Sequence, residues 1–148
     1  MTVQKMIAVF FSLFIMGINT NAQTINNLEV GKEYTLEQIK SALGEPTEVM
    51  SWEDESDIGY GYELSYSTDV FNFGNSGFSS FQLETNKFSV NGLFRVGDNI
   101  SVLSTIPNSR LVLIEAGYYY LYLENNDDPI QISFESDKIT CIWFIMSV

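Results

Sequence analysis

The feature that most constrains the fold is a ten-residue pattern that occurs twice. Residues 81–90 read FQLETNKFSV and residues 132–141 read ISFESDKITC. Both segments alternate apolar and polar residues on either side of a two-residue turn, which is the pattern of a β-hairpin. The turns end in Asn86 and Asp137, residue types that tolerate the left-handed conformation of a tight turn. We therefore expect two equivalent hairpins in a duplicated chain.

Pairing outward from the two turns defines the expected register. The cross-strand pairs are Leu83–Phe88, Phe81–Val90 and Glu84–Lys87 in the first hairpin, and Phe134–Ile139, Ile132–Cys141 and Glu135–Lys138 in the second. Every apolar residue then lies on one face of its hairpin, and an ion pair closes each turn.

The composition favours an acidic, folded protein without catalytic chemistry. The 148 residues are 45% hydrophobic, and their formal charge of −12 disfavours nucleic acid and anionic lipid surfaces as partners. The sequence has no histidine, which removes the commonest general base and metal ligand. We find no Gly-rich phosphate loop and no metal-ligand cluster. We therefore expect no enzyme activity, no catalytic residue, no metal and no cofactor. Glu63 or Asp69 could belong to a carboxylate pair across a cleft, but nothing in the sequence distinguishes them from solvated surface acids.

Residues 1–22 are predicted to be a signal peptide. One lysine precedes an apolar run at 6–18, and the sequence TNA at 20–22 places small residues where a signal peptidase reads them. Cleavage after Ala22 leaves a globular domain, residues 23–148, in the periplasm or outside the cell. An uncleaved membrane anchor is the alternative. No cysteine stands at the cleavage site, where lipid attachment would require one, which disfavours a lipoprotein. We expect no membrane insertion after cleavage.

Residues 34–44 are the clearest predicted helix. Thr35 and Gln38 have the spacing of a capping box, and Gly44 is a natural C-terminal cap. The preceding VGKEYTL segment at 30–36 recurs as VGDNISV at 96–102, where Ser101 takes the place of Thr35. The second helix is expected to be short, because β-branched residues and Pro107 follow.

These patterns predict an α+β fold with one domain made of two tandem repeats, at about 28–94 and 95–148. Each repeat is a helix followed by about four antiparallel strands. Together they are expected to form one antiparallel sheet with the short helices on one face.

The helix and the residues that follow it resemble a known family. Residues 36–46 read LEQIKSALGEP, a helix ending in Leu-Gly-x-Pro that leads into strands, and this is similar to the small outer-membrane-assembly lipoproteins. With the duplication, the whole chain resembles the β-lactamase-inhibitor-protein-like tandem repeat fold. The lipid-bearing cysteine of the lipoproteins is absent, and Tyr34 replaces the glycine that precedes their helix.

The second repeat breaks the alternation of an ordinary one-sided sheet. Cys141, the only cysteine, is expected to be a buried core residue on the face that meets the helices. The residues expected on that face are Ile130, Ile132, Phe134, Ile139, Cys141, Trp143 and Ile145. The residues expected to point away, and to bind a partner, are Tyr118, Tyr120, Tyr122, Ile142, Phe144 and Met146. Burial of this second face inside a closed or strongly curved sheet is the alternative.

Two acidic loops contain oxygen ligands of the kind that Ca²⁺ takes. One contains Glu53, Asp54, Glu55 and Asp57, and the other Glu124, Asn126, Asp127 and Asp128. Neither loop has the calcium-loop spacing, which favours solvated turns.

The sequence therefore predicts a soluble exported binding module whose aromatic sheet face binds or inhibits a protein partner or self-associates. The alternative is a structural envelope-maintenance protein resembling the assembly lipoproteins.

Overall fold

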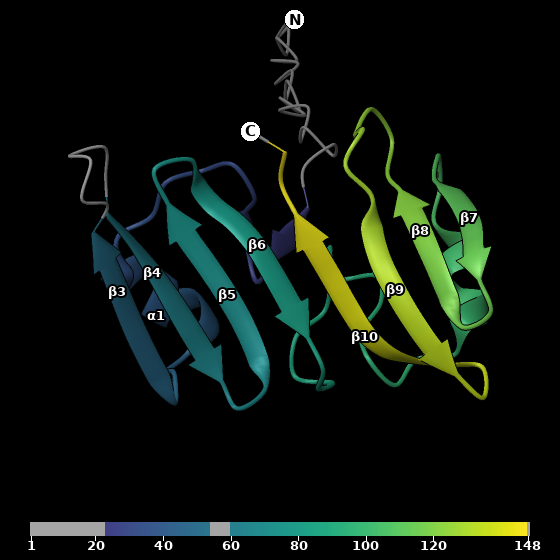
Figure 1. The fold of residues 1–148 in the computed structure, drawn as a ribbon, viewed down its shortest axis with the longest axis horizontal. Helices are drawn as coiled ribbons and strands as arrows, with labels where there is room; N and C mark the ends of the chain where they lie inside the picture. The colour runs from purple at the N-terminus through teal and green to yellow at the C-terminus, as the bar shows by residue number, and fades with distance from the viewer. Residues whose placement is uncertain (1–22, 54–59, 148) are drawn as a thin grey trace, which may run out of the picture.

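The computed structural model describes residues 23–53 and 60–147, and these residues form mainly β-sheet (Figure 1). Two short strands, β1 (Thr24–Ile25) and β2 (Leu28–Glu29), pair with each other. The helices are α1 (Leu36–Leu43) and the 3₁₀ helix η1 (Ile100–Thr105). The long strands are β3 (Glu48–Glu53), β4 (Tyr60–Tyr66), β5 (Asp69–Gly74), β6 (Gly77–Leu83), β7 (Arg110–Glu115), β8 (Tyr118–Tyr122), β9 (Ile130–Glu135) and β10 (Lys138–Ile145).

The predicted α+β fold of two tandem helix-plus-four-strand repeats is wrong. Within the described residues, the protein is mostly sheet: one eight-stranded antiparallel sheet, the small β1–β2 sheet and only two helices. One of the two helices is a 3₁₀ segment rather than an α-helix, since its β-branched residues lower helix propensity. The predicted signal peptide lies outside the described residues, and the repeat boundaries stay a prediction.

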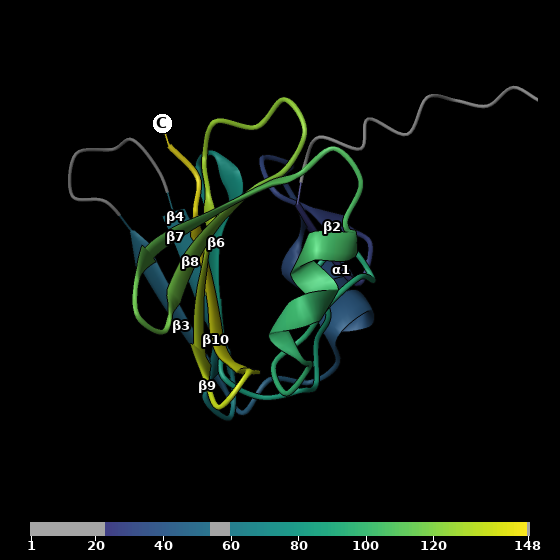
Figure 2. The same cartoon turned by 90° about the vertical axis from the view of Figure 1, so that its right-hand side faces the viewer.

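The eight strands follow the order β3-β4-β5-β6-β10-β9-β8-β7, so β6 and β10 meet at the centre. Phe144 of β10 is opposite Phe81 of β6, and their rings stack at 5.6 Å between centroids. Both helices lie on one side of the sheet (Figure 2). We call that side the inner face and the opposite side the outer face. The core fills the space between the inner face and the helices.

The predicted capping box at the start of α1 is confirmed. Gln38 N donates to Thr35 Oγ1 at 3.2 Å, and Thr35 N donates to Gln38 Oε1 at 2.9 Å. Ile39 and Leu43 are buried against the sheet, and the helix ends at Gly44, which has a positive φ of 91°. In η1, Asn99 caps the helix by accepting from Ser101 N at 2.9 Å, so Ser101 does not take the capping role expected for it.

The first predicted hairpin does not form. Residues after Leu83 leave the sheet, and β6 pairs with β5 and β10 instead. The side chain of Asp69, which is 0% exposed, accepts hydrogen bonds from Glu84 N at 2.7 Å, from Thr85 N at 2.9 Å and from the Thr85 hydroxyl. These contacts turn the chain away from the sheet. Phe88 and Val90, the expected partners of β6, are buried in the core on the helix side.

The second predicted hairpin forms, as β9 and β10, with a change of register inside it. The turn residues Ser136 and Asp137 have positive φ angles of 50° and 62°, and the pairs Glu135–Lys138 and Phe134–Ile139 are those expected. Beyond them a β-bulge lies between Ile139 and Cys141. Ile132 consequently faces Ile142 rather than Cys141, because one extra residue moves the rest of β10 to the opposite face.

The two Val-Gly segments that match in sequence make the same pair of main-chain contacts. Gly31 N donates to Phe78 O and Phe78 N donates to Lys32 O, at 2.8 and 2.9 Å. Gly97 N donates to Ile139 O and Ile139 N to Asp98 O, also at 2.8 and 2.9 Å. Each segment therefore attaches the helical layer to the start of one central strand.

Candidate functional site

The outer face carries a continuous row of side chains across all eight strands of the large sheet. The paired residues, in strand order from β7 to β3, are Val112, Tyr120, Gln131, Trp143, Gln82, Val70, Ser65 and Glu48. With a strand spacing of about 4.8 Å, the row extends over about 34 Å. No helix in the described ranges covers this face (Figure 2). The row therefore lies on a broad, accessible surface.

A ladder of three tyrosines occupies the outer face of β8. The ring centroids of Tyr118 and Tyr120 are 5.5 Å apart, and those of Tyr120 and Tyr122 are 6.3 Å apart, both edge to face. The Arg110 guanidinium lies 4.2 Å from the centroid of Tyr122, and the Tyr118 hydroxyl donates to Gln131. Burial, with Tyr120 nearby, raises the pKa of Tyr118 above its ordinary value. Contacts with Arg110 and Gln131 thus hold the two ends of the ladder in place.

Trp143 and Ile145 extend this aromatic surface to the centre of the sheet. They are 40% and 50% exposed, on a strand whose alternate residues are fully buried. Trp143 is opposite Gln131 of β9, and Gln131 is opposite Tyr120. We call Tyr118, Tyr120, Tyr122, Trp143 and Ile145 the tyrosine–tryptophan patch.

A second apolar area lies near the edge strand β3. Trp52 and Met50 are 45% and 51% exposed and share the outer face of that strand. The Trp52 indole lies over Gly61: a Cβ atom built on Gly61 would be 2.1 Å from Trp52 Cζ2. Gly61 therefore provides the space in which the indole packs, and no other residue type fits there without displacing it.

Polar residues separate the two apolar areas. The outer face of β4, β5 and β6 carries Glu63, Ser65, Asn72, Ser80 and Gln82. Asn72 Nδ2 donates to Ser80 Oγ at 3.0 Å across β5 and β6. This half of the face has the polar alternation expected of a sheet that is covered on one side.

The structure supports three of the six predicted partner-binding residues in their orientation. Tyr118, Tyr120 and Tyr122 face outward, because Leu121 between them is buried in the core. Ile142 and Phe144 are 0% and 1% exposed on the inner face, so their predicted outward orientation is wrong.

Met146 was also expected to point away from the helices, and it packs against the core instead. The residues that take their place on the outer face are Trp143 and Ile145. The bulge before Cys141 causes the exchange. No residue type in the sequence marks the bulge; the only available signal was that both faces of β10 read as apolar.

Cys141 was predicted to be a core residue and is half-buried on the outer face, opposite Ser133. Burial raises the pKa of its thiol, and the nearby carboxylates of Glu84 and Asp69 act in the same direction. A thiol with a raised pKa is a weak nucleophile. We assign it no chemical role.

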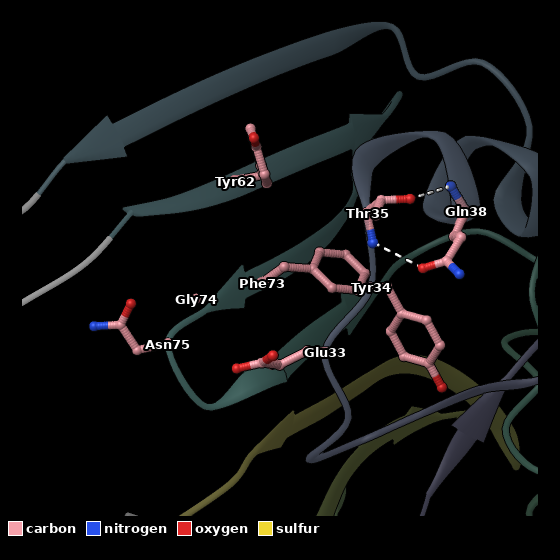
Figure 3. A pocket seen from close by; sticks show the side chains of 9 residues that line it. Glu33, Tyr34, Thr35, Gln38, Tyr62, Phe73, Gly74 and Asn75 are labelled. Atoms are coloured by element: carbon pink, nitrogen blue, oxygen red, sulfur yellow. Dashed lines mark hydrogen bonds between the residues drawn. The ribbon is translucent and has the colours of Figure 1, made fainter.

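A pocket of about 340 Å³ lies on the inner side, between the start of α1 and the ends of β4, β5 and β6 (Figure 3). Its walls include the aromatic rings of Tyr34, Tyr62 and Phe73, with the carboxylate of Glu33 at the rim. The Tyr34 hydroxyl accepts from Glu29 N at 2.8 Å, and Thr35 and Gln38 bond to each other. The polar groups of the helix start are therefore occupied by structural contacts.

The acidic loop at 124–128 is held by protein contacts. Glu124 accepts from Asn108, Asn126 accepts from Asp128 N, and Asp128 accepts from Ser147 N at 2.8 Å. The first acidic loop lies outside the described residues, apart from the backbone of Glu53. Among the residues that the structure describes, no group of three or more acidic or cysteine side chains could hold a metal ion, and no helix is long and apolar enough to cross a membrane.

Comparisons with known proteins give little to add. No protein-family model and no curated protein matches the sequence. Among solved structures, the chain is similar to an extracellular protein containing a SCP domain from Bacillus anthracis str. Ames, with a TM-score of 0.43 and 12% identity. The similarity covers 80% of this chain and 44% of that chain, so this chain spans less than half of that protein's length. A similarity this weak carries no argument, and the resemblance to the β-lactamase-inhibitor-protein-like fold stays a prediction.

Proposed function

We propose that this protein is an exported binding module that uses its outer sheet face to bind a protein partner. The observation that carries the proposal is the tyrosine–tryptophan patch, in which half-exposed Trp143 and Ile145 lie beside the tyrosine ladder of β8. Exposed tyrosine and tryptophan side chains are enriched where proteins bind each other, because they bury much area at a low cost in conformational entropy.

The charge of the chain favours a basic partner. The formal charge is −12, and the outer row ends at Glu48, with Glu63 on the next strand. Carboxylates on the same face as an aromatic patch attract a basic protein and speed its association, while the desolvated rings supply the affinity.

The proposal also includes export of the protein and a binding role without catalysis. The leader at 1–22 is the basis for a periplasmic or secreted location. The outer face offers aromatic, amide and hydroxyl groups and a weak thiol, and this set supports binding rather than reaction. Self-association through the same face is the other form of the proposal, with a second copy as the partner.

The proposal is tested by site-specific photo-crosslinking in the exporting cell. A crosslinker at Gln131, beside Trp143, is expected to capture one defined protein, and a crosslinker at Ser41 on α1 is expected to capture none. Adding Trp143→Ser and Tyr120→Ser should abolish the capture, while the protein stays folded and unfolds in urea in one cooperative transition at a slightly lower midpoint. Equal capture from Ser41, or capture that survives both substitutions, would contradict the proposal. A crosslink to a second copy would identify self-association.

The contribution of charge to the association rate is measured separately. With the captured partner purified, the association rate should fall as ionic strength rises, since salt screens the carboxylates of the outer face. The variant Glu48→Gln with Glu63→Gln should reduce the rate and its salt dependence, and Glu37→Gln on α1 serves as the control. An association rate that does not change with salt would remove the basic partner from the proposal.

A further inference from the structure

Gln23, the first residue that the structure describes, is fixed in place by its two carbonyl oxygens. The residue is 1% exposed. Its main-chain oxygen accepts a hydrogen bond from Val30 N at 2.9 Å, and its side-chain Oε1 accepts from Asn126 Nδ2 at 3.0 Å. The next residue, Thr24, donates its N–H to Asn91 Oδ1 at 2.6 Å and begins β1. The start of the domain is therefore tied both to the loop between β8 and β9 and to Asn91.

The side-chain amide nitrogen of Gln23, unlike the two oxygens, lacks a hydrogen bond within the part of the chain that the structure describes. Nε2 is buried and has no hydrogen-bond partner among the described residues. Buried N–H groups are nearly always paired, because an unpaired one loses its hydration and gains nothing in return. This position therefore suits a residue that keeps the carbonyl oxygen of glutamine and lacks its amide nitrogen.

The sequence before Gln23 supplies the second observation. The small residues at 20–22 predict cleavage after Ala22, which would make Gln23 the amino-terminal residue. Cleavage would then create a charged ammonium group on a residue that is almost fully buried. A buried charge is costly unless it is paired, so a neutral amino terminus suits this position better.

One known reaction of amino-terminal glutamine meets both requirements. The α-amino nitrogen attacks the side-chain carbonyl carbon Cδ, so that an N–Cδ bond forms and the Cδ–Nε2 bond breaks. Nε2 takes both protons that the α-ammonium group loses and leaves as ammonium, and the product is a neutral five-membered lactam. The reaction needs no oxidant, reductant or water. It expels the nitrogen that has no partner, keeps the oxygen that Asn126 contacts, and converts the ammonium group to a neutral amide.

We propose that Gln23 is the amino-terminal residue of the mature protein and is modified there to pyroglutamate. The proposal rests on the predicted cleavage and on the contacts of Gln23, and it is independent of the partner proposed for the outer face.

The test is the intact mass of the full chain, expressed with its own leader and purified from the exporting cell. The expected mass is that of residues 23–148 less one ammonia, and the amino-terminal peptide should be blocked to stepwise degradation. Gln23→Asn is the matched variant: it keeps a side-chain amide but would have to close a four-membered ring, so a free amino terminus is expected. A free Gln23, cleavage at another bond, or a retained leader would overturn the proposal.

Two controls accompany this test. The first distinguishes a modification made in the cell from one made during purification, and the second tests whether the lactam is buried. A synthetic peptide starting at Gln23, carried through the same purification, should stay uncyclised, and cyclisation of that peptide to the same extent would overturn the assignment. Pyroglutamyl peptidase should remove the blocked residue from the unfolded protein and leave the folded protein intact, since the residue is buried. Equally fast removal from both would contradict the proposed place of the lactam in the core.

Discussion

The side chain of Asp69 is predicted to hold the central crossing of this fold, where the chain leaves β6 and enters the helical layer. Its carboxylate accepts three hydrogen bonds, two from the main-chain N–H groups of Glu84 and Thr85 and one from the Thr85 hydroxyl. The variant Asp69→Ala removes both acceptor oxygens, and with them all three hydrogen bonds, at a position with 0% exposure. We expect a large loss of stability, because two N–H groups at the turn lose their partner.

The size of the stability loss follows from the number and type of hydrogen bonds that Asp69 accepts. A hydrogen bond to a charged acceptor contributes roughly 1.5–3 kcal/mol, and bonds that share one acceptor are not additive. We therefore expect Asp69→Ala to lower the free energy of unfolding by about 3–5 kcal/mol. Asp69→Asn keeps an oxygen for the two N–H groups and should cost about 1–2 kcal/mol. Thr85→Val removes one bond and should cost a similar amount, about 1–2 kcal/mol.

Urea unfolding followed by tryptophan fluorescence measures these differences. With a slope of roughly 1–3 kcal/mol per molar urea, the alanine variant should unfold about 2 M earlier than the wild type. Glu63→Ala is the matched control, since it removes a carboxylate from the outer face of the neighbouring strand and should change stability by less than about 0.5 kcal/mol. If Asp69→Ala is as stable as Glu63→Ala, the crossing does not depend on this carboxylate.

Three further predictions test the inner and outer faces. Phe144→Ala should lower stability by about 3–5 kcal/mol and Trp143→Ala by under about 1 kcal/mol, and the reverse order in thermal or urea unfolding would disprove the register after the bulge. Gly61→Val should displace the Trp52 indole, seen as a shifted tryptophan emission that is absent in the double variant with Trp52→Phe; an unchanged emission would contradict the packing of Trp52 on Gly61. Burial raises the pKa of Tyr66 from 10.0 to about 12, so the folded state holds this proton more tightly and stability should fall as pH rises between those values. Tyr66→Phe should make that fall shallower in urea titrations at several pH values, and an equally steep fall would count against the assignment.

Local patterns in the sequence predicted local structure well. The capping box of Thr35 and Gln38 and the turn at Ser136 and Asp137 both form as expected, because each depends on residues a few positions apart. The tyrosines of β8 also alternate as their spacing indicates.

Prediction from local patterns failed where contacts between distant residues decide the structure. Residues 81–90 alternate as a hairpin should, but Asp69, far along the chain, binds Thr85 and turns it out of the sheet. The second arm of the expected hairpin then packs in the core beside the helices, where its apolar residues are buried equally well. Alternation reports which residues are buried and does not report which strand lies next to which.

The bulge in β10 misled the prediction of the outer face for a different reason. The effect of the bulge on stability depends on packing against a distant strand. After the bulge, Ile142 and Phe144 are opposite Leu83 and Phe81 of β6. A prediction from alternation alone therefore assigned Ile142 and Phe144 to the wrong face, while the correct pair, Trp143 and Ile145, was one residue away in each case.

The same bulge bears on how this surface could change during evolution. A relative that lacked one residue between Ile139 and Cys141 would turn the rest of the strand over and present the opposite set of side chains, without a single substitution. Most such deletions would bury tryptophan in place of phenylalanine and be lost. Where one survived, the binding surface would be replaced in one step, so among relatives with different partners a gap at this point is more informative than any exchange of residues.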